Sequence, residues 1–257
     1  MIRSSRLTMR CVLYRLLLVG IMLKEPVQVN SILWVGFPGQ SGGTAIANVV
    51  TGKTAPAGRL SITQYPASFT SVPMTDMSLR PSEINPAGRT YQWYTGGAVY
   101  PFGYGLHYTT FKSRWALPVP PVFSIALLAQ KHTKKYLDTE IFHTFKVVVS
   151  NTGKVASDYV ALLYSSTTAG PQPAPIKSLV SYARARDIAA GKSAVVNLEV
   201  SLGSIARADE NGRFILYPGK YKVALDNDAS LVAEFLLVGK PTRILDFPQP
   251  RSTEPAA

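Results

Sequence analysis

The residues that look most suited to catalysis are Gly39-Gln40-Ser41-Gly42-Gly43, which match the G-x-S-x-G pattern around a nucleophilic serine. Asp76 and His107 follow in the order that such a hydrolase uses for its acid and its base. A nucleophilic serine must stand on a strained turn directly at a strand end, yet residues 36–40 separate Ser41 from the predicted strand. An upstream strand and loop for the oxyanion hole are also missing. A serine hydrolase acting through Ser41 is therefore the least favoured alternative.

A second group of residues imitates a phosphate-binding loop. Gly52-Lys53-Thr54 resembles the end of a P-loop, but Ala47 occupies the position of its first glycine. The tripeptide also ends a predicted helix, where the helix dipole repels phosphate. The glycines from 36 to 43 do not spell G-x-G-x-x-G, and Pro56 stands where an acidic residue would bind a ribose. We expect no nucleotide and no other cofactor.

The histidines and cysteine do not form a metal-binding pattern. The three histidines, which share no spacing typical of metal ligands, are His107, His132 and His143. Cys11 is the single cysteine, so an internal disulfide and a cysteine zinc site are excluded.

Two carboxylates, Asp76 and Glu83, could lie near Arg80 in one loop. Loop carboxylates are usually solvated or cap backbone N–H groups. The residues alone therefore assign no catalytic, cofactor-binding or metal-binding side chain.

The elements that would position these residues begin with a short α/β segment. Residues 31–36 are a continuous apolar run, typical of a strand buried on both faces. In residues 44–50 the apolar side chains share one helical face, and Gly52 suits the end of that helix. A second strand is predicted at 60–64. This strand–helix–strand unit is too short to be a domain, which suggests a truncated sheet.

The rest of the chain predicts a loop region, a linker and a β sandwich. Residues 65–110 are rich in Pro, Gly, Tyr and Trp and predict loops, and 113–138 predict a linker with three prolines. From residue 141 the hydrophobic period becomes two. Seven strands are predicted, at 142–150, 159–165, 178–185, 194–200, 213–217, 221–225 and 231–238. This pattern is typical of an immunoglobulin-like or fibronectin type III-like sandwich.

Composition and charge narrow the function classes. The chain has 257 residues, 46% of them hydrophobic, and a net charge of +12. The surplus cations lie in the N-terminal tail and in the predicted linker, not on an aromatic-lined basic face, so we expect no nucleic-acid binding. The apolar run 16–23 is too short to cross a bilayer, and no small-x-small cleavage site follows it. The tail is therefore not a convincing signal peptide.

Three segments carry a family resemblance. SILWVGFPGQSGGTAIANVVTGKTAPAGRLSITQYPASF, VPMTDMSLRP and NPAGRTYQWYTGGAVYPFGYGLHYTTF closely resemble family 3 glycoside hydrolases, and the second is most like the fungal β-xylosidases of that family. The later segments VVVSNTGKVASDYVALLYSS and LYPGKYKVAL resemble the fibronectin type III-like domain of these enzymes. The resemblance covers about residues 30–240 and leaves 1–29 unmatched.

The resemblance implies an architecture and an activity. It implies an α/β sandwich domain whose C-terminal part is 30–112, a linker at 113–138, a fibronectin type III-like domain at 139–240, and tails at 1–29 and 241–257. The implied parent enzyme is an extracellular, retaining exo-β-xylosidase that acts on xylo-oligosaccharides. Alternatives are a β-glucosidase or arabinofuranosidase of the same family, or a non-catalytic module that binds a carbohydrate or the rest of a hydrolase.

The implied catalytic residues lie outside the matched segments. In the family both the nucleophile and the acid/base residue precede them, and the surroundings of Glu25 do not resemble the acid/base loop. We therefore expect this chain to lack both catalytic carboxylates and to be inactive alone.

Overall fold

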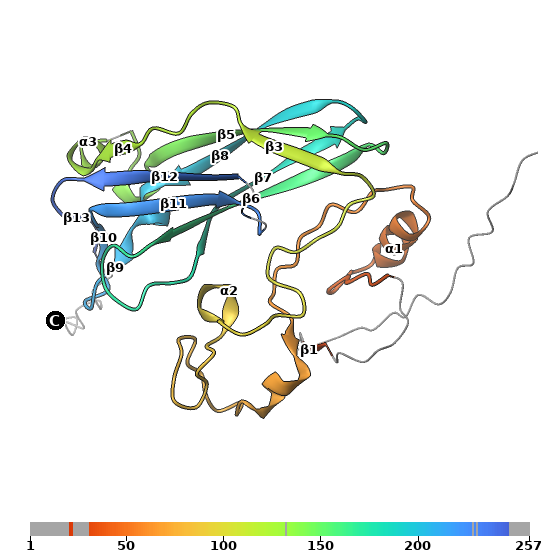
Figure 1. Cartoon of the computed structure of the whole chain (residues 1–257), viewed down its shortest axis with the longest axis horizontal. Coiled ribbons are helices and arrows are strands. Elements are labelled where there is room, and N and C mark those ends of the chain that lie inside the picture. The colour runs from red at the N-terminus through yellow and green to blue at the C-terminus, as the bar shows by residue number, and fades with distance from the viewer. Residues whose placement is uncertain (1–20, 23–30, 132, 228, 230, 247–257) are drawn as a thin grey trace, which may run out of the picture.

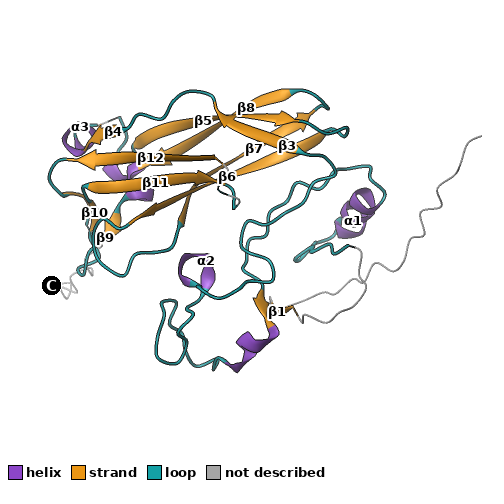
Figure 2. Ribbon diagram, in the orientation of Figure 1, coloured by secondary structure: helices purple, strands orange, loops and turns teal. Residues whose placement is uncertain are grey.

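The computed structural model describes residues 21–22, 31–131, 133–227, 229 and 231–246. A β sandwich occupies the C-terminal half, and a loop-rich part with a few short elements lies along one side of it (Figures 1 and 2). In the described part of the chain, no helix has the length and apolar character needed to cross a membrane.

The sandwich consists of two sheets that face one another. The larger sheet has the strand order β4 (Val122–Ser124), β12 (Leu231–Val238), β11 (Gly219–Leu225), β6 (Ser157–Thr167) and β7 (Ser178–Ile188). The smaller has the order β3 (Phe111–Trp115), β5 (Ile141–Asn151) and β8 (Ser193–Ser201). Neighbouring strands are antiparallel, except that β12 and β4 run parallel.

A third, small sheet and three short helical segments close one end of the sandwich. The strands of this sheet are β13 (Thr242–Leu245), β10 (Phe214–Leu216) and β9 (Arg207–Ala208). The helical segments are α3 (Ile125–Ala129), η2 (Leu137–Thr139) and α4 (Leu202–Ile205).

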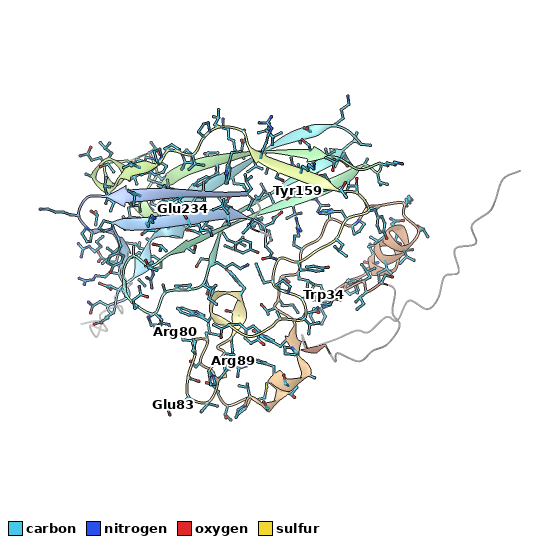
Figure 3. The ribbon with its side chains drawn as sticks, viewed as in Figure 1. Trp34, Arg80, Glu83, Arg89, Tyr159 and Glu234 are labelled. Carbon is cyan, nitrogen blue, oxygen red and sulfur yellow. The ribbon has the colours of Figure 1, made fainter. Side chains whose placement is uncertain are left out.

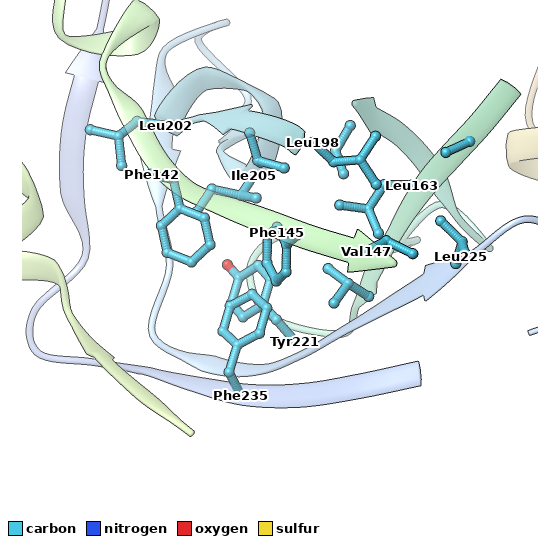
Figure 4. Packing of buried hydrophobic residues seen from close by; sticks show 14 of the residues in the cluster. Phe142, Phe145, Val147, Leu163, Leu198, Leu202, Ile205, Tyr221, Leu225 and Phe235 are labelled. Atoms are coloured by element: carbon cyan, nitrogen blue, oxygen red, sulfur yellow. The ribbon is translucent and has the colours of Figure 1, made fainter. Parts of the chain in front are cut away.

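The core lies between the two facing sheets (Figure 4). Phe145, Val147 and Val149 alternate along β5 and are each at most 1% exposed. They meet side chains of the opposite sheet, among them Tyr221 and Phe235, whose rings are stacked with centroids 5.6 Å apart. Two apolar faces that bury one another in this way give the domain its own core.

All seven strands predicted from residue 141 onward are confirmed as β5, β6, β7, β8, β10, β11 and β12. The interpretation of residues 113–138 as a linker is wrong, because this segment contributes most of β3 and all of β4 and α3. β3 pairs along its whole length with β5, and β4 pairs with β12. The prolines lie between these two edge strands, where missing N–H donors cost little.

The N-terminal part contains less regular structure than predicted. The helix expected at 44–50 is confirmed as α1 (Gly42–Val50), and Gly52 follows it with φ of +76°. The strands expected at 31–36 and 60–64 are wrong: residues 31–36 form no strand, and the second segment has only a bridge from Gln64 to Tyr100. No described strand lies beside residues 31–36, so their apolar sequence alone cannot create a ladder. Leu60 and Gln64 exchange backbone hydrogen bonds with residues 99–104, but these contacts do not form a continuous strand pair.

The remaining elements of this part are short. β1 (Ile21–Met22) pairs in parallel with β2 (Tyr65–Pro66), and η1 (Ala67–Ser71) and α2 (Thr90–Trp93) interrupt the loops. The prediction that residues 65–110 are mostly loop is confirmed. Residues 1–20 and 23–30, including Glu25, lie outside the described residues.

Candidate functional site

A cleft of about 530 Å³ lies at the seam between the loop-rich part and the sandwich. Its polar lining comes from both parts and includes Arg59, His107, Tyr159, Asp226 and Asn227. Loop residues thus meet the start of β6 and the turn that follows β11. Figure 3 shows Tyr159 on the side of the sandwich that faces this part of the chain.

Asp226 is the centre of the cleft's hydrogen-bond network. Arg59 Nη2 donates to its Oδ2 at 3.0 Å, and the backbone N–H of Leu162 donates to its Oδ1 at 3.0 Å. The Tyr159 hydroxyl also donates to Oδ2. Arg59 uses its Nε to donate to the carbonyl oxygen of Val160 at 3.2 Å. A carboxylate with these three partners is held in one orientation and serves as a structural link between the loop-rich part and the sandwich.

Burial shifts the pKa values of His107 and Tyr159 in the cleft, in each case in the direction that favours the neutral form. Burial lowers the pKa of His107, and the nearby Arg59 cation lowers it further, while the Pro56 backbone opposes this. Burial also raises the pKa of Tyr159, and the negative charge of Asp226 adds to the effect. The imidazole stacks on the Tyr159 ring with centroids 5.8 Å apart. This stacked aromatic pair contributes packing where the loop-rich part meets the sandwich.

A second set of contacts fastens the same seam beside the cleft. Asn227 donates from Nδ2 to the Phe102 carbonyl at 2.7 Å and accepts from Lys177 Nζ at 2.7 Å. Lys177 also lies over the ring of Tyr164, 4.4 Å from its centroid. Phe102 in turn stacks on Tyr91, with ring centroids 4.3 Å apart. Aromatic and cation–π contacts of this kind suit a permanent interface.

The serine-hydrolase residues are not brought together. Ser41 is exposed at the start of α1, and its hydroxyl makes no capping hydrogen bond. Asp76 accepts a hydrogen bond from the backbone of Ser78, and His107 packs in the seam. No hydrogen bond joins any two of Ser41, Asp76 and His107. Residues 52–54, which imitate a P-loop, are exposed at the C-terminal end of α1.

The loop carboxylates and Arg80 also separate. Asp76 lies against Arg89, whose Nη2 donates to the Asp76 carbonyl oxygen at 3.0 Å. Arg80 lies over the Trp93 ring, 5.2 Å from its centroid, and Glu83 is exposed at the outer edge of its loop (Figure 3). These three side chains therefore do not form the cluster that the sequence allowed.

His143, the other histidine that the structure describes, packs among aromatic rings. His143 lies edge-on to Phe145, and burial followed by the charge of Lys131 lowers its pKa. His132 lies outside the described residues. Within the described ranges, no three His, Cys, Asp or Glu side chains gather closely enough to hold a metal ion.

Sequence reasoning missed the residues that organise the seam. Asp226, Arg59 and Tyr159 belong to no motif in the sequence. Arg59 and Asp226 are 167 residues apart, so no local spacing could have linked them. The one available signal was the acidic residue directly after the alternating strand 221–225.

Family models match both parts of the chain. The model described as "Glycosyl hydrolase family 3 C-terminal domain" matches residues 12–108, and the "Fibronectin type III-like domain" model matches 159–229. The first match therefore begins upstream of residue 30, where we expected the resemblance to start.

Curated relatives are similar over nearly the whole chain. "Probable exo-1,4-beta-xylosidase bxlB" of Aspergillus fumigatus is 51% identical over 237 residues, which is 90% of this chain and 30% of the relative. "Probable exo-1,4-beta-xylosidase xlnD" of Neosartorya fischeri is 49% identical over 237 residues, with the same two coverages. The chain thus spans about 30% of the length of these relatives.

Solved structures agree with this similarity. A "GH3 exo-beta-xylosidase (XlnD) in complex with xylobiose aziridine activity based probe" has a TM-score of 0.82 and 44% identity, covering 87% of this chain and 30% of the solved one. β-Glucosidase 3B from Thermotoga neapolitana, in complex with glycerol, has a TM-score of 0.61 and 24% identity, covering 83% and 29%. The second likeness shows the fold alone.

Proposed function

Because the chain belongs to glycosyl hydrolase family 3 through the C-terminal domain at residues 12–108, we propose that it is the C-terminal part of a retaining exo-β-xylosidase. The observation that carries the proposal is its 51% identity, over 237 residues, to a probable exo-1,4-β-xylosidase. The whole enzyme would remove terminal xylose from xylo-oligosaccharides. The solved relative with a xylobiose-derived probe supports a carbohydrate substrate.

Within that enzyme, this chain supplies structure and domain packing. Retaining chemistry needs two carboxyl groups about 5–5.5 Å apart, one as nucleophile and one as acid. The described carboxylates with defined contacts serve structural roles. Asp226 binds Arg59, Asp158 binds Arg184, and Asp209 binds Arg213. Glu140 accepts from Thr133 at 2.6 Å and from the backbone of Lys134.

One loop of the chain presents an apolar surface that suits packing against the remainder of the enzyme. Met74 and Met77 are 89% and 84% exposed, and Leu79 and Ile84 in the same loop are also exposed. Several large apolar side chains gathered in one exposed loop are typical of an interaction site. Since the relatives are more than three times as long as this chain, their additional sequence is the natural partner of the loop.

The test combines this chain with the upstream portion of a relative. We would co-express it with the upstream portion of the Aspergillus fumigatus relative, and assay aryl β-xyloside, β-glucoside and α-arabinofuranoside substrates. The proposal expects no turnover by the chain alone and recovery of xyloside turnover by the pair. If the pair hydrolysed the glucoside or the arabinofuranoside faster than the xyloside, the enzyme would be a β-glucosidase or an arabinofuranosidase of the family and not a xylosidase.

The chain alone needs its own control for residual activity. Asp76→Asn and Glu83→Gln remove the two carboxylates of the loop that includes Arg80. If the isolated chain hydrolysed an aryl xyloside and either variant abolished this, these carboxylates would be catalytic and the structural role would be wrong. An ester substrate tested with Ser41→Ala covers the serine-hydrolase alternative in the same way.

We propose an extracellular location for the whole enzyme, because xylo-oligosaccharides arise from a polymer too large to enter a cell. The family resemblance supports the same location. Measuring the protein in the culture medium and in washed cells of the source organism tests this directly, and retention inside the cells would contradict it.

A further inference from the structure

A second, smaller pocket of about 230 Å³ lies away from the seam cleft. Its walls are Arg80 from a loop, Trp93 at the end of α2, the end of β6, and the segment that includes β9. The two pockets share no lining residue. The proposed xylosidase function assigns no role to this pocket.

Two arginines of the pocket lack a carboxylate partner. Arg207 Nη1 donates to the Ala169 carbonyl at 2.7 Å, and its Nη2 donates to the Pro173 carbonyl at 3.2 Å. Arg80 lies over the Trp93 ring without an ion pair. No Asp or Glu is among the described residues that line this pocket.

Both guanidinium groups therefore lie beside one pocket with no acidic side chain on its described wall. Burial lowers the pKa of Arg207, Tyr221 and Tyr217 oppose this, and the neighbouring Arg80 cation adds to the lowering. A pKa lowered from 12.5 by these causes still leaves Arg207 charged at neutral pH. Two positive charges that face the same pocket repel one another, and an anion bound between them would offset this repulsion.

The pocket wall also carries serine residues. Ser165, only 8% exposed, and Ser166 line the pocket. Thr167 beside them donates to the Lys220 carbonyl at 2.7 Å. A serine hydroxyl in such a wall can donate to a bound oxygen atom.

We propose that this pocket binds a small oxyanion, a carboxylate, phosphate or sulfate group, between Arg80 and Arg207. Guanidinium groups match such anions because their N–H donors form paired hydrogen bonds with two oxygens. The volume is below the range of about 300–1,000 Å³ usual for drug-sized ligands, so the occupant is a free inorganic anion or one sugar ring that carries an acid group.

The experiment measures ligand binding to the full chain by calorimetry and by the shift in its melting temperature. The probes are sulfate, inorganic phosphate, glucuronate and, as the neutral analogue, glucose, each at constant ionic strength with chloride as balance. We expect saturable binding of at least one oxyanion and none of glucose. If glucuronate binds most tightly, the natural ligand is a sugar acid. If phosphate or sulfate binds most tightly, it is an inorganic anion. Either result supports the site.

Variants separate the pocket from the general positive charge. Arg80→Met removes one cation without touching the carbonyls that Arg207 holds, and we expect it to weaken oxyanion binding at least tenfold. Ser165→Ala should weaken binding by a smaller factor. Arg114→Met removes an exposed cation of β3 outside the pocket and should leave binding unchanged. Absence of saturable binding, or equal weakening by Arg80→Met and Arg114→Met, would overturn the proposal.

Discussion

Arg59 and Asp226 join the loop-rich part to the sandwich through an ion pair of 3.0 Å, across 167 residues of sequence. Each side chain is only 13% exposed. Asp226 occupies the left-handed region with φ of +52°, which aims its carboxylate at Arg59 and at the N–H of Leu162. A turn residue of the sandwich thus positions a loop of the other part.

Removing the charge of Asp226 should weaken this connection. Asp226→Asn keeps a residue that tolerates positive φ but leaves the Arg59 guanidinium without an anion. Breaking a largely buried pair by removing one partner costs several kcal/mol, so we expect a loss of about 2–4 kcal/mol in unfolding free energy. Urea unfolding at neutral pH measures it.

The matched control for this variant is Glu234→Gln. Glu234 pairs with Lys220 at 4.0 Å, and the side chains are 58% and 75% exposed. An exposed pair of this kind contributes about 0–1 kcal/mol. Similar losses in Asp226→Asn and Glu234→Gln would mean that the seam pair has no special role.

A methyl group at Gly103 should also open the seam. A Cβ added there would lie 2.3 Å from the Tyr164 hydroxyl and 2.8 Å from Leu162 Cδ1, and the backbone has φ of +79°. We expect Gly103→Ala to cost about 2–4 kcal/mol through overpacking and backbone strain. Gly97→Ala, where a Cβ meets nothing within 4 Å, should change stability by less than about 0.5 kcal/mol. Equal melting temperatures of the two variants would refute the close approach.

Mild acid should destabilise the chain through its half-buried histidines. Burial lowers the pKa of both His107 and His143 in the folded state. As pH falls through about 6.5, the unfolded chain therefore binds protons first, and stability decreases until the lowered folded pKa values are reached. His107→Gln should reduce the slope of stability against pH between about 6.5 and 5. An unchanged slope would show that His107 titrates normally.

Local sequence patterns predicted the sandwich well, because the alternation of apolar and polar residues can be recognised within a single strand. Along β5, Phe145, Val147 and Val149 alternate with exposed or half-buried residues, so one strand reveals its buried face without knowledge of its neighbours. The apolar run at 31–36 failed for the opposite reason, since a strand also needs a partner to pair with. The seam pair of Arg59 and Asp226 depends on tertiary contacts and was invisible to any local pattern.

The sandwich begins earlier in the chain than the sequence predicted. The expected boundaries, 139–240, omit β3, β4 and β13, although most of β3 and all of β4 lie in the segment predicted as a linker. β3 covers one edge of β5, and its Trp115 packs on Phe145 with ring centroids 6.0 Å apart. Trp115 Nε1 also donates to the Val232 carbonyl at 3.2 Å, which ties β3 to the opposite sheet.

We therefore predict that a fragment of residues 109–246 unfolds cooperatively and that the fragment 139–240 is markedly less stable. Losing β3 exposes the edge of β5 and uncovers part of the core, and a half-buried tryptophan at such a contact contributes about 2 kcal/mol or more. Thermal unfolding of both fragments, together with Trp115→Ala in the longer one, measures the contribution. If 139–240 melted as cooperatively and at the same temperature as 109–246, then β3 and β4 would be dispensable, and the original boundary would describe the folding unit after all.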